Sequence, residues 1–82
     1  MDITIYSTST CSFCHALMGW LDSNKIAYTK VVTDEDESGM MEFMKVNDGM
    51  IGVPFTVIKD ADGSVTKISG YDQGKFKQVL GL

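Results

Sequence analysis

The sequence of 82 residues contains no arginine, only one histidine and only one proline. Seven lysines stand against eleven acidic residues, which gives a formal net charge of −4 at pH 7. A protein that binds nucleic acid neutralises phosphates with a basic patch, and no such patch can be assembled from this composition. We therefore expect no nucleic-acid partner.

Long apolar runs are also missing. The longest mostly apolar stretch, residues 50–58, contains Gly52 and Pro54 and is too short to span a bilayer. The first residues include neither a basic segment nor a long apolar segment, so we expect no signal peptide. Two cysteines are too few for the disulfide framework of a small secreted domain. We expect a cytoplasmic protein with no membrane partner.

The two cysteines that are present belong to one motif, Cys11-Ser12-Phe13-Cys14. Before it, residues 3–6 alternate between apolar and polar side chains, which is the period of a strand. After it, apolar residues recur at the spacing of one helix face: Cys14, Leu17, Met18 and Leu21. The motif therefore lies where a strand turns into a helix.

This position has a chemical consequence for Cys11. At or just outside the first helical turn, unpaired backbone N–H groups and the positive end of the helix dipole favour a thiolate. Cys14, three residues further on, is close enough to form a disulfide with Cys11. The motif therefore predicts a dithiol that cycles between reduced and oxidised states.

The rest of the sequence continues the alternation of strands and helices. Strands are predicted over residues 1–6, 27–32, 53–58 and 64–69, and helices over residues 12–23, 38–46 and from Asp72 onward. A helix between two strands is typical of a parallel pair, whereas the turn at residues 60–63 indicates an antiparallel hairpin. We expect a single α/β domain over residues 1–82, of βαβαββα order, with a four-stranded mixed sheet and helices on both faces.

Two other stretches have a structural interpretation. Residues 33–38 are acids and helix-capping residues, interpreted as a solvated loop that complements the dipole of the next helix, with an acidic docking surface as the alternative. The six methionines are expected to fill the core. A further interpretation is that three of the methionines form an adaptable apolar surface near the dithiol: Met40, Met41 and Met50.

Three short motifs follow one another along the chain. The cysteine motif comes after a strand that ends in Tyr6-Ser7, Val53-Pro54 precedes the hairpin, and Gly70-Tyr71-Asp72 precedes the last helix. In this order and at this spacing, over essentially the full length, the chain resembles a glutaredoxin. The resemblance implies a thioredoxin-like fold and a thiol–disulfide oxidoreductase.

The resemblance implies roles for four residues. Cys11 matches the exposed nucleophilic cysteine, and Cys14 matches the partly buried resolving cysteine. Pro54 matches a proline whose preceding peptide bond is cis, which presents the backbone of Val53 to a bound thiol substrate. The residues alone would favour an ordinary proline at the start of a strand.

Further matches imply a substrate-binding region. Gly70, Tyr71 and Asp72 match the loop that holds the γ-glutamyl end of glutathione in glutaredoxins, and Asp72 is equally suited to cap the last helix. Many glutaredoxins have Pro-Tyr between the cysteines, where this chain has Ser12-Phe13. Phe13 keeps the aromatic character of that position and lacks the hydroxyl.

The sequence is compatible with two reductants. Thr8 stands where many glutaredoxins have a lysine that favours the thiolate and contacts a glutathione carboxylate, which puts the affinity for glutathione in doubt. Ser69-Gly70-Tyr71 is equally similar to the Ser-Gly-Phe of small redoxins that reduce ribonucleotide reductase and are recharged by thioredoxin reductase. We expect a monomer that reduces protein or glutathione mixed disulfides, with glutathione as co-substrate or thioredoxin reductase as reductant, and no tightly bound cofactor.

Haem attachment, metal binding and a redox-inert binding module compete with this interpretation. Cys11-x-x-Cys14-His15 has the form of the c-type haem attachment motif, but a small c-type cytochrome should be mostly helical. Structural zinc usually needs four ligands, so no metal site is expected from three residues in one turn. An iron–sulfur cluster shared by two chains with glutathione is known among dithiol glutaredoxins whose active-site proline is replaced, as Ser12 replaces it here. A redox-inert binding module is disfavoured because both cysteines are present.

Overall fold

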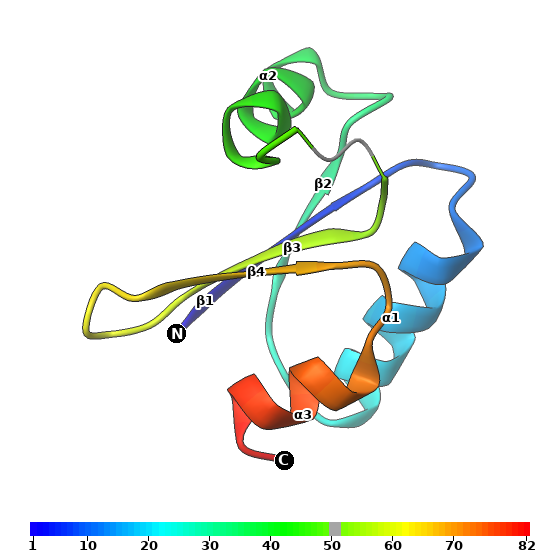
Figure 1. Cartoon of the computed structure of the whole chain (residues 1–82). Coiled ribbons are helices and arrows are strands. Elements are labelled where there is room, and N and C mark those ends of the chain that lie inside the picture. Colours follow the sequence, from blue (N-terminus) through cyan, green and yellow to red (C-terminus); the bar gives the residue numbers. More distant parts are fainter. Residues whose placement is uncertain (50–51) are drawn as a thin grey trace.

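The computed structural model describes residues 1–49 and 52–82 (Figure 1). Its elements, in chain order, are β1 (Asp2–Ser7), α1 (Ser12–Ser23), β2 (Thr29–Val32), α2 (Glu37–Val46), β3 (Phe55–Lys59), β4 (Val65–Ser69) and α3 (Gln73–Leu80). The predicted βαβαββα order is confirmed. Met50, expected at an apolar surface near the dithiol, lies outside the described residues. No helix in the described ranges has the length and apolar character needed to cross a membrane.

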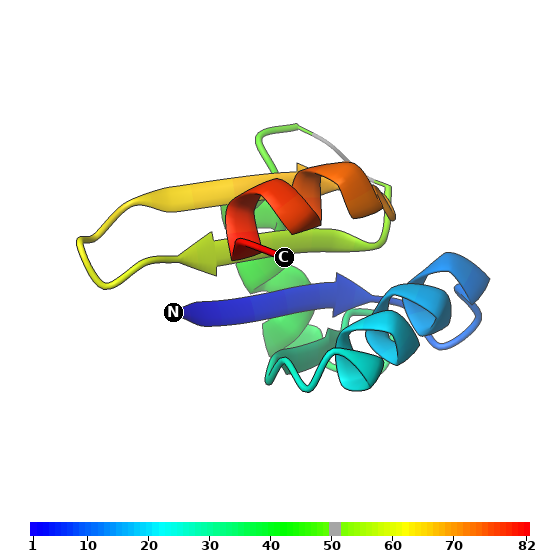
Figure 2. The ribbon, with the colours of Figure 1, turned by 90° about the horizontal axis from the view of Figure 1, so that it is seen from below.

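The four strands form one mixed sheet in the order β2-β1-β3-β4. β1 pairs in parallel with β2, which places Thr4 opposite Thr29, and β3 pairs antiparallel with both β1 and β4. The α1 crossover joins the parallel pair, and a tight turn joins the hairpin, as predicted. β1 is therefore held on both sides, and α1 begins beyond its carboxyl end (Figure 2).

Helices cover both faces of the sheet, as predicted. α1 and α3 lie on one face, and α2 lies on the other (Figure 1). Because side chains alternate along a strand, Ile3 and Ile5 point toward α1 and α3, whereas Tyr6 points toward α2. The cluster on the α1–α3 face consists of Ile3, Ile5, Cys14, Leu17, Met18, Leu21, Ile58, Ile68 and Phe76. The cluster on the α2 face consists of Tyr6, Phe43, Phe55 and Val57.

β2 begins at Thr29, two residues later than the sequence pattern predicts. After α1 the chain turns at Lys25, whose φ of 58° lies in the left-handed region, and the Ile26 N–H donates to the Leu21 carbonyl at 3.0 Å. Ile26 and Tyr28 pack against the α1–α3 core. This segment therefore follows the helix before it joins the sheet.

β3 also begins two residues later than predicted, at Phe55. The reason is that Pro54 has no N–H for the strand ladder. The expected cap of the last helix is confirmed, because the Asp72 carboxylate accepts a hydrogen bond from the Lys75 N–H at 3.2 Å. The element boundaries thus shift where local backbone chemistry overrides side-chain pattern.

The expectation that the methionines fill the core is wrong for α2. Met41 and Met44 are 60% and 67% exposed, and Met40 is 37% exposed. The helix turns Gly39 and Phe43 toward the sheet, so the three methionines lie on the arc that faces solvent. Only one side of a surface helix meets the sheet, and an apolar residue outside that side is not buried by its helical spacing alone.

Candidate active site

The Cys-x-x-Cys motif lies at the amino end of α1. Cys11 is the N-cap of this helix, with the extended backbone (φ −83°, ψ 107°) typical of N-cap residues. Its sulfur takes the place of the usual capping oxygen, because the Cys14 N–H donates to Cys11 Sγ at 3.1 Å. The structure therefore places Cys11 at the start of the helix, as predicted.

The sulfur atoms of Cys11 and Cys14 are joined in a disulfide, and their Cα atoms are 5.2 Å apart. This separation is usual for a disulfide, for which the range is about 4.4–6.8 Å. Cys14 is fully buried in the α1–α3 core, and Cys11 is half-buried. An outside molecule can therefore approach the sulfur of Cys11, whereas the sulfur of Cys14 is enclosed.

The backbone sets the electrostatic environment of Cys11. Within α1, which is described throughout, no acidic residue lies in the first turn, so the partial positive charge of the helix terminus is not opposed there. Once the disulfide is reduced, this terminus and the Cys14 N–H both favour a thiolate at Cys11. Thr8, at the position of the family's lysine, contributes its carbonyl, which accepts from the Cys11 N–H at 3.3 Å.

The Val53–Pro54 peptide bond is cis, as the resemblance implies. The Val53 carbonyl oxygen lies 3.8 Å from Cys11 Sγ. The Pro54 carbonyl accepts a hydrogen bond from the Gly70 N–H at 2.8 Å. Gly70 has a φ of 80°, a left-handed conformation that favours glycine. Two loops that are distant in sequence are therefore connected beside the first cysteine.

A shallow groove of about 260 Å³ opens beside the dithiol. Five of the predicted site residues line it: Phe13, Val53, Pro54, Gly70 and Tyr71. Phe13 is 66% exposed, so its ring is available to a partner molecule. Among the described residues that line the groove none carries a charge, and the Tyr71 hydroxyl is their only polar side-chain group. The groove therefore suits an apolar segment with a backbone that can hydrogen-bond.

Two predicted residues are not part of this lining. Thr8 lies in the loop before Cys11, and the Asp72 carboxylate is engaged as the cap of α3. Sequence reasoning missed Gln73, whose Nε2 donates to the Tyr71 hydroxyl at 2.6 Å and so orients that side chain at the groove. A glutamine at the start of an exposed helix is ordinary, and no local pattern signals this contact.

A second contact that the sequence does not reveal involves the acidic run at residues 33–38. Asp34 accepts hydrogen bonds from the Ser9 N–H at 3.0 Å and from the Ser9 hydroxyl at 2.5 Å. These two donors, the hydroxyl first, hold the pKa of Asp34 below its usual value. The run is therefore more than a solvated loop, because Asp34 is tied to the segment before α1. Four consecutive acids look alike in sequence, and nothing in the pattern singles out this one.

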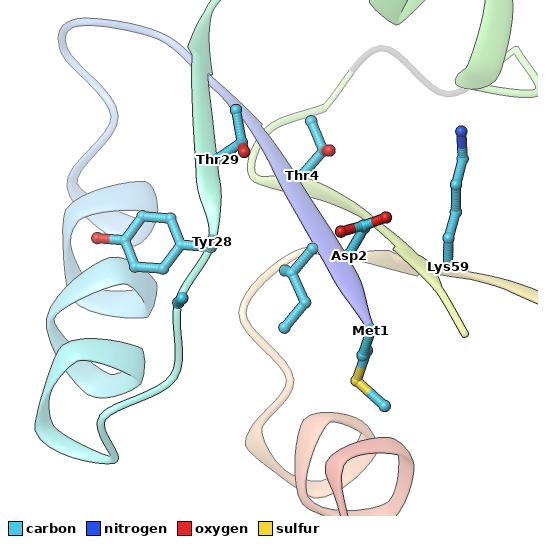
Figure 3. A pocket seen from close by; sticks show the side chains of 8 residues that line it. Met1, Asp2, Thr4, Tyr28, Thr29 and Lys59 are labelled. Carbon is cyan, nitrogen blue, oxygen red and sulfur yellow. The ribbon is translucent and has the colours of Figure 1, made fainter. Parts of the chain in front are cut away.

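A larger hollow, of about 400 Å³, lies at the other end of β1 (Figure 3). Its lining residues are Met1, Asp2, Ile3, Thr4, Ala27, Tyr28, Thr29 and Lys59. It occupies the space beside the start of β1 that β2 leaves open because β2 begins late. The cysteines follow the opposite end of the strand, so we assign this hollow no part in their chemistry.

The fold also bears on the competing classes. A four-stranded sheet is not the mostly helical architecture expected of a small c-type cytochrome, so the haem interpretation is not supported. His15 is exposed on α1. Among residues 1–49 and 52–82, no three side chains of His, Cys, Asp or Glu are grouped so that they could hold a metal ion.

The order of the strands, the helices on both faces and the dithiol at the start of the first helix define a protein of the thioredoxin-like class. A family model described as Glutaredoxin matches residues 3–61. Two relatives provisionally named glutaredoxins, from two strains of Mycobacterium tuberculosis, are each 36% identical over 77 residues, which cover 94% of this chain and 89% of theirs. The chain belongs to the glutaredoxin family.

Solved structures agree on the fold. The NrdH-redoxin of Escherichia coli, a glutaredoxin-like protein with a thioredoxin-like activity profile, has a TM-score of 0.76 at 20% identity, covering 96% of this chain and 95% of that one. A buckwheat glutaredoxin in complex with glutathione has a TM-score of 0.70 at 21% identity, covering 98% of this chain and 70% of that one. Glutaredoxins in general are thiol–disulfide oxidoreductases that use glutathione as a co-substrate.

Proposed function

We propose that this protein is a dithiol redoxin that reduces disulfides of proteins, or mixed disulfides between proteins and glutathione, through Cys11 and Cys14. The observation that carries the proposal is the asymmetry of the pair. Cys11 is half-buried at the helix terminus, and Cys14 is fully buried in the core. In this proposal the Cys11 sulfur attacks the substrate disulfide, and the Cys14 sulfur then attacks Cys11 and releases the reduced substrate.

In the first step, the Cys11 thiolate attacks one sulfur of the substrate disulfide. A bond forms between Cys11 Sγ and that sulfur, the bond between the two substrate sulfurs breaks, and the departing thiolate takes a proton from water. The substrate segment next to the attacked sulfur lies in the groove, where the Val53 carbonyl and the Phe13 ring are open to it. The helix terminus raises the thiolate fraction and therefore the rate.

In the second step, Cys14 loses its proton and attacks Cys11 Sγ. The mixed disulfide breaks, the second substrate sulfur leaves and takes up a proton, and the product is the Cys11–Cys14 disulfide. Over the two steps the dithiol gives two electrons to the substrate. Cys14 supplies one proton, and the proton taken from water in the first step replaces the one that Cys11 lost to water when it ionised. We place this single redoxin domain, as a monomer, in the cytosol, where a reducing environment keeps the dithiol available.

A second candidate function concerns the reductant. The two electrons can return to the Cys11–Cys14 disulfide from two molecules of glutathione, or from thioredoxin reductase. Glutathione carries two carboxylates, but Thr8 occupies the position of the lysine that would meet one of them, and the groove residues that the structure describes are all uncharged. An uncharged groove favours a protein surface over glutathione. The second candidate, which also rests on the likeness of Ser69-Gly70-Tyr71 to the small redoxins, is a redoxin recharged by thioredoxin reductase that donates electrons to ribonucleotide reductase.

The iron–sulfur alternative depends on thiolates from outside the chain. Cys11 is the sulfur of the pair that another molecule can approach, so each chain would supply one ligand and glutathione the others. The residues present fit such a cluster only between two copies, and we derive no reaction step from it. Brown colour after anaerobic purification would support this alternative.

The deciding experiment measures the reduction of hydroxyethyl disulfide with two electron donors. One assay supplies glutathione with its reductase, and the other supplies NADPH with thioredoxin reductase. Activity with the first donor only identifies a glutaredoxin in the strict sense, and activity with the second only identifies the ribonucleotide-reductase type. Activity with neither donor contradicts the proposal.

Single-cysteine variants test the separate roles of the two sulfurs. Cys11→Ser should abolish exchange in both assays, because the sulfur at the helix terminus is lost. Cys14→Ser should keep part of the glutathione-linked activity, because removal of glutathione from a mixed disulfide needs Cys11 alone. Circular dichroism of both variants controls for folding. Equal loss of activity in the two variants would instead indicate a strictly dithiol route.

A further inference from the structure

The segment before α1 is tied to the segment before α2. The Thr33 N–H and hydroxyl both donate to the Ser7 carbonyl, at 2.8 and 3.1 Å, and the Ser7 hydroxyl donates to the Val31 carbonyl at 3.4 Å. Two residues past Ser7 and one past Thr33, the Asp34 carboxylate accepts from the Ser9 N–H and hydroxyl at 3.0 and 2.5 Å. We call this set of hydrogen bonds the clasp.

The clasp has a buried part and an exposed part. Ser7 and Thr33 are only 1% and 4% exposed, and the bonds from Thr33 to Ser7 continue the parallel pairing of β1 and β2 one residue past the end of β2. Ser9 and Asp34 are both exposed. Their bonds bury no apolar surface, so their structural effect is to fix the position of the loop that contains Ser9.

This loop has few other supports. The backbone bond from the Cys11 N–H to the Thr8 carbonyl, at 3.3 Å, closes a turn directly before the helix, and Ser9 and Thr10 within that turn are exposed. An exposed segment with few buried contacts opens easily unless its own hydrogen bonds hold it. Asp34 supplies two such bonds inside the turn that Cys11 closes.

The position of Cys11 at the helix terminus depends on this turn. Its extended N-cap backbone aligns Sγ with the Cys14 N–H, and a shifted turn would weaken that contact. We propose that Asp34 is a positioning residue for thiol–disulfide exchange, whose carboxylate holds the turn so that Cys11 stays in the capping position. This inference rests on the proposed function, in which Cys11 is the nucleophile.

Asp34 also carries a negative charge, and charge and positioning predict opposite effects. An anion disfavours a nearby thiolate, so loss of the charge alone would make Cys11 more reactive. Loss of the positioning bonds would make Cys11 less reactive. Because Asp34 is exposed, water and salt screen its charge, and we expect the positioning effect to be the larger. Glu35 has the same charge without a hydrogen bond to Ser9 in the described structure, which makes it a matched control.

The test measures the pH dependence of Cys11 alkylation by iodoacetamide in the reduced protein, with the modified residue identified by mass spectrometry. In Asp34→Ala the alkylation rate at neutral pH should fall by about two- to fivefold, the factor that corresponds to a helix-terminus interaction. Asp34→Asn keeps an oxygen that can accept from the Ser9 N–H, so it should recover most of the wild-type rate. Glu35→Gln should match the wild type.

Two results would overturn the inference. Identical alkylation profiles for wild type and folded Asp34→Ala would show that the turn does not depend on the carboxylate. Faster alkylation of both Asp34→Ala and Asp34→Asn would show that only the charge matters. Should Asp34→Ala fail to fold, Ser9→Ala takes its place, because it removes the hydroxyl that donates to Asp34. The inference requires that this variant also slows alkylation of Cys11. Alkylation needs neither a disulfide substrate nor a reductase, so a redoxin inactive with both donors would still give a clear answer here.

Discussion

The two faces of the sheet are built differently. The α1–α3 face buries the larger cluster, in which aliphatic side chains from both helices and strands surround Cys14. The α2 face buries a smaller cluster that is mainly aromatic, and Met41 and Met44 of the same helix remain exposed. Cys14 is thus buried in the larger of the two clusters.

The difference follows from the residues that each helix turns inward. α1 presents an aliphatic stripe, whereas α2 presents Gly39 and Phe43. The Phe43 ring packs against Tyr6 and Phe55, with ring centroids 5.5 and 5.8 Å apart. α2 is therefore held by a few aromatic contacts and by a close approach to the sheet. We expect core substitutions on the α1–α3 face to cost more, because more apolar area is buried there.

The largest effect is expected from Leu17→Ala on the α1–α3 face. Leu17 is fully buried, and truncation of a buried leucine leaves a cavity and lowers the free energy of unfolding by about 2–5 kcal/mol. Met41→Ala, at an exposed position of α2, is the control and should change it by at most about 0.5 kcal/mol. Urea unfolding of the oxidised variants measures both. Equal losses would remove the contrast between a buried and an exposed helix face.

An intermediate effect is expected from Gly39→Ala. A Cβ at Gly39 would overlap Cγ1 of Val31, so this variant should lower the free energy of unfolding by about 1–3 kcal/mol, although alanine favours the helix. In α1, a Cβ at Gly19 would meet no described atom within 4 Å beyond the helix's own backbone. Gly19→Ala should therefore raise the free energy of unfolding by up to about 1 kcal/mol. If thermal unfolding showed both variants stabilised, α2 would have room to move away from β2.

The smallest effect is expected from Tyr6→Phe, which removes a bond between β1 and α2. The Tyr6 hydroxyl donates to Glu42 Oε1 at 2.6 Å, and the loss of this bond should cost about 1 kcal/mol at neutral pH. Burial and, to a lesser extent, Glu42 raise the pKa of Tyr6 above its usual value. At pH values just above 10, an unfolded tyrosine, with a pKa of about 10, ionises, whereas Tyr6 in the folded protein therefore stays protonated.

The sign of the pH dependence follows from this shift. The stability linked to Tyr6 is fully present below the unfolded pKa and is lost as the pH rises above it, because only the unfolded state then gains from ionisation. Urea unfolding at a series of alkaline pH values should show a shallower fall for Tyr6→Phe than for the wild type. Tyr28→Phe serves as the comparison variant. Burial first and Asp22 second also raise the pKa of Tyr28, but the Tyr28 hydroxyl donates to the Asp22 carboxylate in α1 and not to α2. If the free energy of unfolding fell as steeply with pH in Tyr6→Phe as in the wild type, the loss of stability would come from a group other than Tyr6.

Local features were predictable from the sequence because they depend on neighbours along the chain. The switch from a two-residue to a helical period placed Cys11 at the start of α1, and a capping carboxylate placed the start of α3 at Asp72. The order of elements followed from the same patterns. The cis bond before Pro54 and the grouping of Phe13 with Tyr71 came from the resemblance to glutaredoxins rather than from any local signal.

The sequence by itself thus determined the βαβαββα order and the place of the dithiol, since periodicity and capping act within a few residues. Only the tertiary structure decided which methionines of α2 meet solvent and which of four similar acids binds Ser9. The Ser9–Asp34 and Tyr6–Glu42 bonds join residues 25 and 36 positions apart. Their partners are set by how loops and helices meet around β1, which no stretch of sequence contains.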